Sequence, residues 1–203
     1  MAIINIKSKE RKPAALLFFM FFSIVSATIT GASVRDAVFL TQFDKSYLPV
    51  MFITIAVVMA GVIALYKKLT AGQDQIFVIS ISGALFSVSL FLLQSNLSGL
   101  FIPVLYIWME VVTILSIFQF WILAGEVFNA RQAKRIFTLM GAGGSFAGMG
   151  AGYGIKPFVS TFGSENLLFL TIFFIGLSVV MAQMLRPFRM PHKHKKVNSK
   201  PVP

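Results

Sequence analysis

The chain has 203 residues, of which 57% are hydrophobic and 12% are charged, roughly half the charged share of soluble domains. This composition excludes a conventional water-facing domain and places most of the chain in a lipid bilayer. The net charge of +11 would indicate nucleic acid as the partner of a soluble protein. Here the basic residues lie between apolar runs and at both ends, so we expect anionic lipid and no nucleic acid as their partner.

Six apolar stretches are long enough to cross a bilayer, which takes about 20 residues per helix. We expect these helices at 14–33 (continuing toward 40), 47–66, 75–93, 101–127, 136–159 and 166–185. The predicted fold class is all-α, a polytopic membrane protein with six transmembrane helices. We expect residues 1–13 to form a basic cytoplasmic N-terminus, 14–186 the transmembrane domain and 187–203 a flexible basic cytoplasmic tail.

The predicted loops carry their basic residues unequally. Loops on one side hold the N-terminal, 67–68, 131–135 and C-terminal basic residues, whereas the other side holds only Arg35, Lys45 and Lys156. The positive-inside rule then predicts both termini in the cytoplasm and the chain as a multi-pass protein of the cell's inner membrane. The basic N-terminus resembles a signal peptide, but the apolar run after it is too long and lacks a cleavage pattern, so we expect a retained helix.

The first predicted helix carries small polar side chains at spacings that fall on one face, namely Ser23, Ser26, Thr30 and Ser33. Such a face either packs against another helix or lines a hydrated cavity, in which case Ser26 and Thr30 would contact a substrate. Arg35 and Asp36 lie toward the end of this helix. Arg35 either anchors the helix at the outer interface or binds the phosphate or carboxylate of a substrate.

Glu110 lies inside the fourth predicted helix, roughly 14 Å from its outer end. An ionised carboxylate at that depth costs several kcal/mol unless it is paired or hydrated. Tyr106 and Thr113 share its face by spacing, so we include them in a candidate substrate-binding or coupling site. Glu110 is either a structural residue, protonated or hydrogen-bonded, or an acid that gates, couples or contacts substrate.

Glu126 lies near the cytoplasmic end of the same helix, close to a basic turn at 129–135 that contains Arg131, Lys134 and Arg135. The carboxylate either latches one conformation of a gate through these cations or forms a simple salt bridge at the helix end. We assign these four residues to gating.

Seven glycines lie between 141 and 154. No strand precedes them and they match neither a P-loop nor the dinucleotide-binding pattern, so they do not indicate a nucleotide-binding loop. Gly144, Gly148 and Gly152 recur every four residues, which is typical of close helix packing. His192 and His194 lie in the tail without a third ligand, and the helices lack a catalytic base, so we expect no enzyme activity, metal or cofactor.

Two segments of the chain together resemble a known family. Residues 35–40 place a basic–Asp pair at the end of helix one, and 47–49 bring a proline to the start of helix two. Residues 110–128, which include Phe120 and Trp121, precede a basic segment at 130–135 and the glycine-rich helix. These features resemble the ATP/ADP (nucleotide) translocases of plastids and intracellular bacteria, relatives of the major facilitator superfamily.

The resemblance implies the amino-terminal half of a major-facilitator-type transporter that exchanges ATP for ADP, or carries related nucleotides, by alternating access. Arg35 and Glu110 match charged positions important for transport in that family, although plastid members have Lys where this chain has Arg35. Such carriers have about twelve helices in two halves. We therefore expect a homodimer, a separately encoded second half, or a truncated remnant. The alternative is a non-transporting membrane anchor or assembly subunit.

Overall fold

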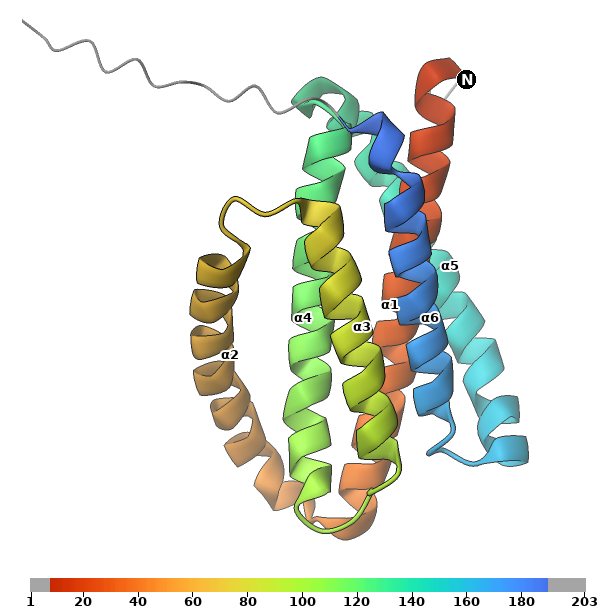
Figure 1. Cartoon of the computed structure of the whole chain (residues 1–203). Helices are drawn as coiled ribbons and strands as arrows, with labels where there is room; N and C mark the ends of the chain where they lie inside the picture. The colour runs from red at the N-terminus through yellow and green to blue at the C-terminus, as the bar shows by residue number, and fades with distance from the viewer. Residues whose placement is uncertain (1–7, 190–203) are drawn as a thin grey trace, which may run out of the picture.

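The computed structural model of the chain describes residues 8–189, without the side chains of residues 8, 9, 130, 131 and 133–135. This part of the chain consists of helices joined by short loops and contains no strand (Figure 1). The α-helices are α1 (Ser8–Gln42), α2 (Leu48–Thr70), α3 (Gln75–Gln94), α4 (Phe101–Val127), α5 (Ala130–Phe162) and α6 (Leu167–Met184). Single 3₁₀ turns, η1 (Lys45–Tyr47) and η2 (Arg186–Phe188), follow α1 and α6. The predicted all-α class is confirmed.

Five to six of the described helices are suited to cross a membrane. All the described α-helices except α5 are long and apolar enough to cross a membrane, and their most apolar windows have mean hydropathies of 2.0 to 2.6. α5 is long enough, at 33 residues, but it is less apolar because it contains the basic segment, the glycines and Lys156. The sixth span that we expected at 136–159 is thus supported by length and not by hydropathy.

The basic segment that the sequence predicted as a turn belongs to α5. Asn129 lies just before the helix, and its side chain accepts a hydrogen bond from the Gln132 backbone N–H at 3.0 Å. The Gln132 side chain accepts one from the Asn129 backbone N–H in return, also at 3.0 Å. This capping box satisfies donors at the helix start, so α5 begins several residues earlier than predicted.

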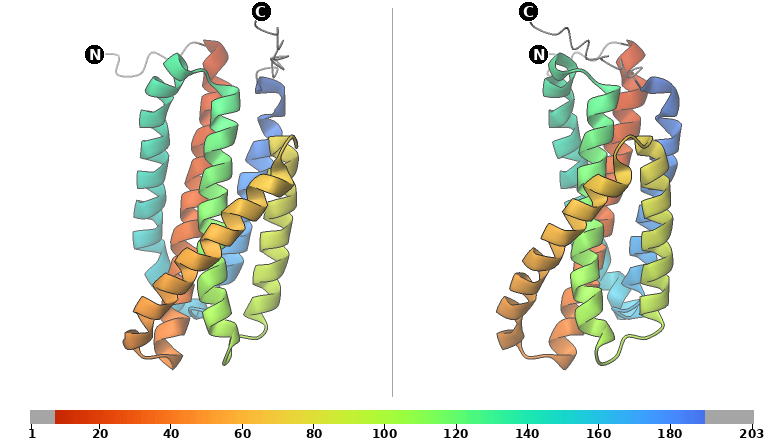
Figure 2. Two further views of the ribbon diagram at one scale, coloured as in Figure 1. Left: turned by 90° about the vertical axis from the view of Figure 1, so that its left-hand side faces the viewer. Right: turned by 60° about the vertical axis from the view of Figure 1, so that its left-hand side comes forward.

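The helices pack in two related triplets. α1 lies inside the bundle, mainly against α4, α5 and α6, while α4 packs against α1, α2 and α3. The same helix contacts result when α1 is exchanged with α4, α2 with α5, and α3 with α6. The contact between α1 and α5 then corresponds to that between α4 and α2, and the contact between α1 and α6 corresponds to that between α4 and α3. Because α1 and α4 run in opposite directions, the two triplets have inverted orientations (Figures 1 and 2).

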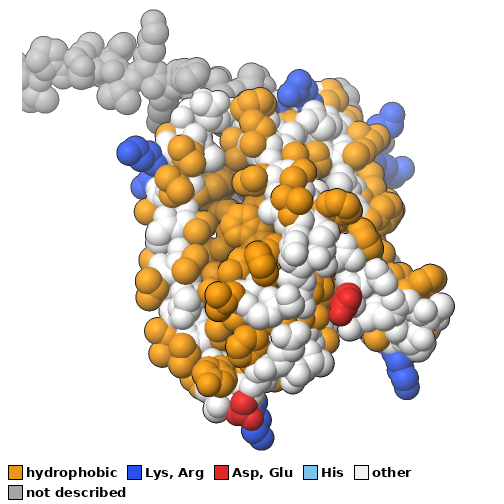
Figure 3. All heavy atoms as spheres, turned by 60° about the horizontal axis from the view of Figure 1, so that its bottom comes forward, with side chains coloured by type: hydrophobic (Ala, Val, Ile, Leu, Met, Phe, Trp, Pro, Cys, Tyr) orange, Lys and Arg blue, Asp and Glu red, His pale blue; other side chains and the backbone are white. Residues whose placement is uncertain are grey.

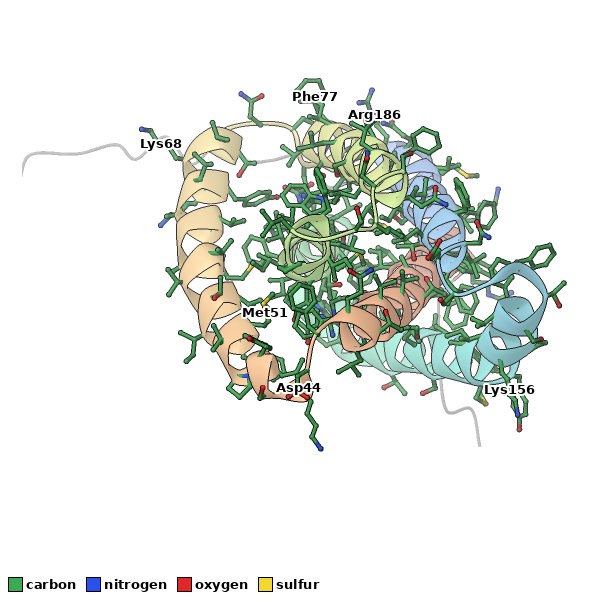
Figure 4. All side chains as sticks on the ribbon, turned by 90° about the horizontal axis from the view of Figure 1, so that it is seen from below. Asp44, Met51, Lys68, Phe77, Lys156 and Arg186 are labelled. Atoms are coloured by element: carbon green, nitrogen blue, oxygen red, sulfur yellow. The ribbon has the colours of Figure 1, made fainter. Side chains whose placement is uncertain are left out.

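The two ends of the bundle differ in charge. The start of α1, the α2–α3 and α4–α5 loops and the end of α6 lie at one end, which we call the basic end (Figure 2). Its described cations are Arg11, Lys12, Lys67, Lys68, Arg186 and Arg189. The loops after α1, α3 and α5 lie at the opposite end, where Asp44, Lys45 and Lys156 are found (Figure 4). The loops therefore group as predicted, whereas the side of the membrane that each end faces stays a prediction.

The lateral surface of the bundle is largely hydrophobic. Side chains such as Ile53 and Val57 of α2 are 67% and 70% exposed. In Figure 3, which shows the bundle obliquely with the end opposite the basic end turned forward, hydrophobic side chains cover much of the surface and charged ones lie mainly near its edges. A water-soluble protein rarely exposes so much contiguous apolar surface, so the helices contact the lipid bilayer.

Candidate functional site

An ion pair joins α1 to α4. The guanidinium of Arg35 donates from Nη1 to Oε2 of Glu110 at 2.5 Å and from Nε to Oδ1 of Asp36 at 2.9 Å. The same guanidinium lies over the ring of Tyr106, with 4.5 Å between its central carbon and the ring centroid. Charge-assisted hydrogen bonds and a cation–π contact thus hold one arginine on three sides. We call these four residues the Arg35 cluster.

The cluster lies well inside the bundle. Arg35 is seven residues from the end of α1, and Glu110 is nine residues from the start of α4 at the same end. At 1.5 Å per residue these are depths of about 10 and 14 Å. The side chain of Arg35 is 14% exposed and that of Glu110 is 31% exposed. A charge at this depth needs a partner, and the two residues supply one to each other.

The cluster carries one positive and two negative formal charges. Asp36 is the most accessible member, with 50% of its side chain exposed. Glu110 accepts from Nη1 and Asp36 accepts from Nε, so an anionic ligand that takes two parallel hydrogen bonds from one edge of the guanidinium displaces one of them. The geometry therefore allows Arg35 to exchange one of its carboxylate partners for an anionic ligand.

Ser26 and Thr30 lie outside the cluster, although the sequence placed them in the same site. Both are buried on α1, and the hydroxyl of Thr30 is 2.9 Å from that of Thr171 on α6. They line a cavity of about 330 Å³ between α1, α5 and α6. Thr30 therefore links two helices and, like Ser26, also faces the cavity, whereas contact of either residue with a substrate stays a prediction.

Thr113 also lies apart from the ion pair. It lines a small cavity of about 10 Å³ between α1, α4 and α6, together with Thr28, Ser116 and Ser178. That volume matches a single water molecule. Thr113 thus lies beside a small polar cavity, one turn along α4 from Glu110.

A second ionic cluster ties three helices together at the basic end. Arg189, just after η2, forms ion pairs with Glu126, whose Oε2 lies 2.8 Å from Nε of the arginine, and with Asp74 at the start of α3. The hydrogen bond from Arg189, helped by backbone N–H groups of α3, lowers the pKa of Asp74. We call Asp74, Glu126 and Arg189 the basic-end cluster.

The sequence predicted Glu126 as a gating residue but missed Arg189, which it assigned to the tail. The side chains of Arg131, Lys134 and Arg135 lie outside the described side chains, so their predicted contacts with Glu126 stay a prediction. The signal for Arg189 was its position close to the end of the last apolar stretch, at the same end as Asp74 and Glu126.

The predicted glycine stripe is packed only in part. A methyl group on Gly144 would stand 3.2 Å from the ring of Phe21 on α1, whereas at Gly148 and Gly152 it would meet only open space. Gly143, which the stripe omits, approaches the backbone oxygen of Phe18 to 3.2 Å by the same measure. Within the described residues, close packing against a neighbouring helix is therefore found at Gly144, while helix packing at Gly148 and Gly152 stays a prediction.

No group of three or more histidine, aspartate or glutamate side chains within the described residues is arranged to hold a metal ion. His192 and His194 lie outside those residues.

Comparison with models of known protein families, with curated proteins and with solved structures found no match.

Proposed function

We propose that this chain forms one half of a membrane transporter for small anionic solutes, working by alternating access together with a second half. Nucleotides, including ATP and ADP, are the substrate class that the sequence resemblance implies. The observation that carries the proposal is the Arg35–Glu110 pair, 2.5 Å long and well inside an apolar helix bundle. A protein that only anchors or assembles gains nothing from charges at that depth, where each costs several kcal/mol when unpaired.

Arg35 is suited to an anionic substrate because a guanidinium binds phosphate or carboxylate oxygens through two parallel hydrogen bonds. In the ligand-free arrangement Glu110 occupies Nη1 of Arg35. An arriving phosphate would replace Glu110, and the released carboxylate would then take a proton or another partner. Substrate binding would thereby break the link between α1 and α4 and couple occupancy to movement of these helices.

The packing pattern supports the same proposal. Two inverted triplets of helices are the internal architecture of each half of a major-facilitator transporter, and substrate sites of such carriers lie at the interface between halves near mid-membrane. α1 and α4, which correspond under the exchange of triplets, both contribute to the Arg35 cluster. The second half would be another copy of this chain or a different polypeptide.

We further propose that the basic end faces the cytoplasm, in the inner membrane, because Lys and Arg accumulate on that side of membrane proteins. The basic-end cluster would then stabilise the conformation that is closed toward the cytoplasm, with Arg131, Lys134 and Arg135 as additional cations near Glu126. Opening this end would require Arg189 to release Asp74 or Glu126.

The alternative function is a membrane anchor or assembly subunit. It is favoured by the open space beside Gly148 and Gly152, which suits permanent attachment of another helix. In this alternative the Arg35 cluster only joins α1 to α4. Substitutions in the cluster would then alter the stability of the protein, and there would be no transport activity for them to affect.

Counter-exchange in proteoliposomes tests the proposal, with labelled ATP inside and ADP outside and then reversed. We expect Arg35→Ala to raise the KM for the nucleotide and reduce exchange at least about ten-fold, because one charge-assisted hydrogen bond contributes roughly 1.5–3 kcal/mol. Glu110→Gln should instead lower both KM and the maximal rate, because it frees Arg35 for the anion but removes the group that resets the site. Asp44→Asn, in the loop after α1, serves as the control and should exchange normally.

Two results would contradict transport. The first is no exchange of ATP, ADP, other nucleotides or inorganic phosphate by wild-type protein that is folded and inserted, tested both alone and with membrane extract supplying a second half. The second is exchange that both Arg35→Ala and Glu110→Gln leave unchanged. Either result, with normal assembly of all variants, supports the anchor.

A further inference from the structure

A groove of about 440 Å³ lies between α2 and α4 toward the basic end. α2 packs against the bundle through Met51 and Met59, which are buried, and separates from α4 further along (Figures 1 and 4). The side chains that line the groove include Ile63, Tyr66 and Lys67 of α2 and Ile114, Phe118 and Ile122 of α4. Its walls are therefore almost entirely apolar, and Lys67 lies at its edge near the basic end.

The dimensions of the groove suit a hydrocarbon chain. From Ile114 to Ile122 is eight residues, or about 12 Å along the helix. An acyl chain is unbranched and apolar, so it fills an apolar groove without leaving a polar group of its own unpaired. An apolar channel also gives a nucleotide no polar partners.

Two polar groups at the groove lack partners within the described residues. Lys67 takes part in none of the salt bridges found there. The hydroxyl of Tyr66 is buried and has no hydrogen-bond partner, while its ring lies edge-on to Phe118 with centroids 5.8 Å apart. A buried hydroxyl and an ammonium beside an apolar channel match the ester and phosphate oxygens at the top of a lipid chain.

We propose that the α2–α4 groove is a binding site for an anionic phospholipid of the bilayer, with one acyl chain in the groove and the phosphate at Lys67. The basic end lies where lipid headgroups contact the protein, and Lys67 reaches that level along its own aliphatic stem. The lipid would fill the space between α2 and the bundle and complete the hydrogen bonding of Tyr66. This site does not depend on transport activity.

Lys68 offers a matched control because it lies next to Lys67 on α2 and carries the same charge, but points away from the bundle (Figure 4). If anionic lipid is held only by general attraction to a basic surface, neutralising either lysine should weaken lipid binding equally. If the lipid occupies a specific site, only neutralising Lys67 should weaken its binding. A third variant, Ile63→Trp, fills the groove and leaves every charge in place.

The experiment is native mass spectrometry of the full chain released from nanodiscs of phosphatidylglycerol and phosphatidylcholine in equal amounts. We expect the wild type to retain one phosphatidylglycerol preferentially. Lys67→Gln should reduce that preference about five-fold, as loss of roughly 1 kcal/mol of attraction per lysine requires. Lys68→Gln should retain the wild-type preference, and Ile63→Trp should lose the bound lipid. Equal melting temperatures in phosphatidylcholine alone establish that the variants are folded.

Three results would overturn the proposal. Equal losses in Lys67→Gln and Lys68→Gln would mean surface attraction only. Full lipid retention by Ile63→Trp would place the lipid elsewhere. Lipid-free dimers that Ile63→Trp dissociates would mean that a second copy covers the groove.

Discussion

Arg35 has three partners of different kinds, namely the carboxylates of Asp36 and Glu110 and the ring of Tyr106. Asp36 is its neighbour in sequence and half exposed, whereas Glu110 comes from another helix and is less accessible. The contact with Glu110 holds two helices together, while the contact with Asp36 is local. At the residue scale this difference explains why Glu110, and not Asp36, is the partner whose release would change the packing of helices.

Asp74 both caps the start of α3 and forms an ion pair with Arg189, and the substitution Asp74→Asn separates these two roles. Its carboxylate accepts hydrogen bonds from the backbone N–H groups of Ile76 and Phe77 at the start of α3, and it pairs with Arg189. Asparagine caps a helix about as well as aspartate, so Asp74→Asn removes the ion pair and keeps the cap. The side chain is 47% exposed, so we expect a loss of no more than about 1 kcal/mol, or about 2–4 °C in melting temperature, at pH 7.

The pH dependence of this loss follows from the pKa of Asp74. Arg189 lowers that pKa below the value of 3.8 of an unperturbed aspartate, so the pair stabilises the fold above pH 3.8. The stabilisation disappears as the pH falls through the lower pKa of the folded state. Melting temperatures of wild type and Asp74→Asn should therefore converge as the pH is taken from 7 to 3. A difference that stays constant over this range would show that the pair does not contribute.

α3 approaches α6 closely through a glycine, while part of α5 presents its glycines to open space. A methyl group on Gly83 of α3 would stand 2.4 Å from Cγ2 of Val179 on α6, but on Gly148 of α5 it would touch nothing. At the scale of the element, the same residue type thus serves close packing in one helix and leaves a free face in another.

We expect Gly83→Ala to destabilise the protein and Gly148→Ala not to. Overpacking against the short, branched side chain of Val179 costs about 1–3 kcal/mol, which exceeds the roughly 1 kcal/mol that alanine gains over glycine in a helix. Thermal unfolding of both variants in the same detergent measures the difference. Equal stability of the two variants would mean that α3 and α6 are not in the close contact described.

At the scale of the whole molecule, the distribution of charge between the two ends predicts orientation. The chain contains no cysteine, so single cysteines report on individual loops. Gln73 lies in the α2–α3 loop at the basic end, and Ser98 lies in the α3–α4 loop at the other end. We expect a membrane-impermeant maleimide to label Ser98→Cys on intact cells and Gln73→Cys only after permeabilisation, because the basic end should face the cytoplasm. The reverse labelling pattern would refute this orientation.

The sequence by itself determined the class of the protein, the approximate helix positions and the grouping of basic loops at one end. These properties depend on hydropathy, which is local along the chain, and on the alternation of directions in antiparallel helices. It also identified Arg35, Asp36 and Glu110 as candidates, because charged residues within an apolar helix can be recognised without knowing their partners. Tyr106 was identified because it shares a helical face with Glu110. It did not reveal that the four meet.

Only the tertiary structure decided which faces of the helices meet. Counting residues gives the depth of a side chain, but the direction in which it points relative to another helix depends on packing throughout the bundle. Arg35 and Glu110 are 75 residues apart, and Thr30 and Thr171 are 141 apart, so no local pattern links them. For the same reason the glycine spacing on α5 was visible in the sequence, whereas the open space beside Gly148 and Gly152 was not.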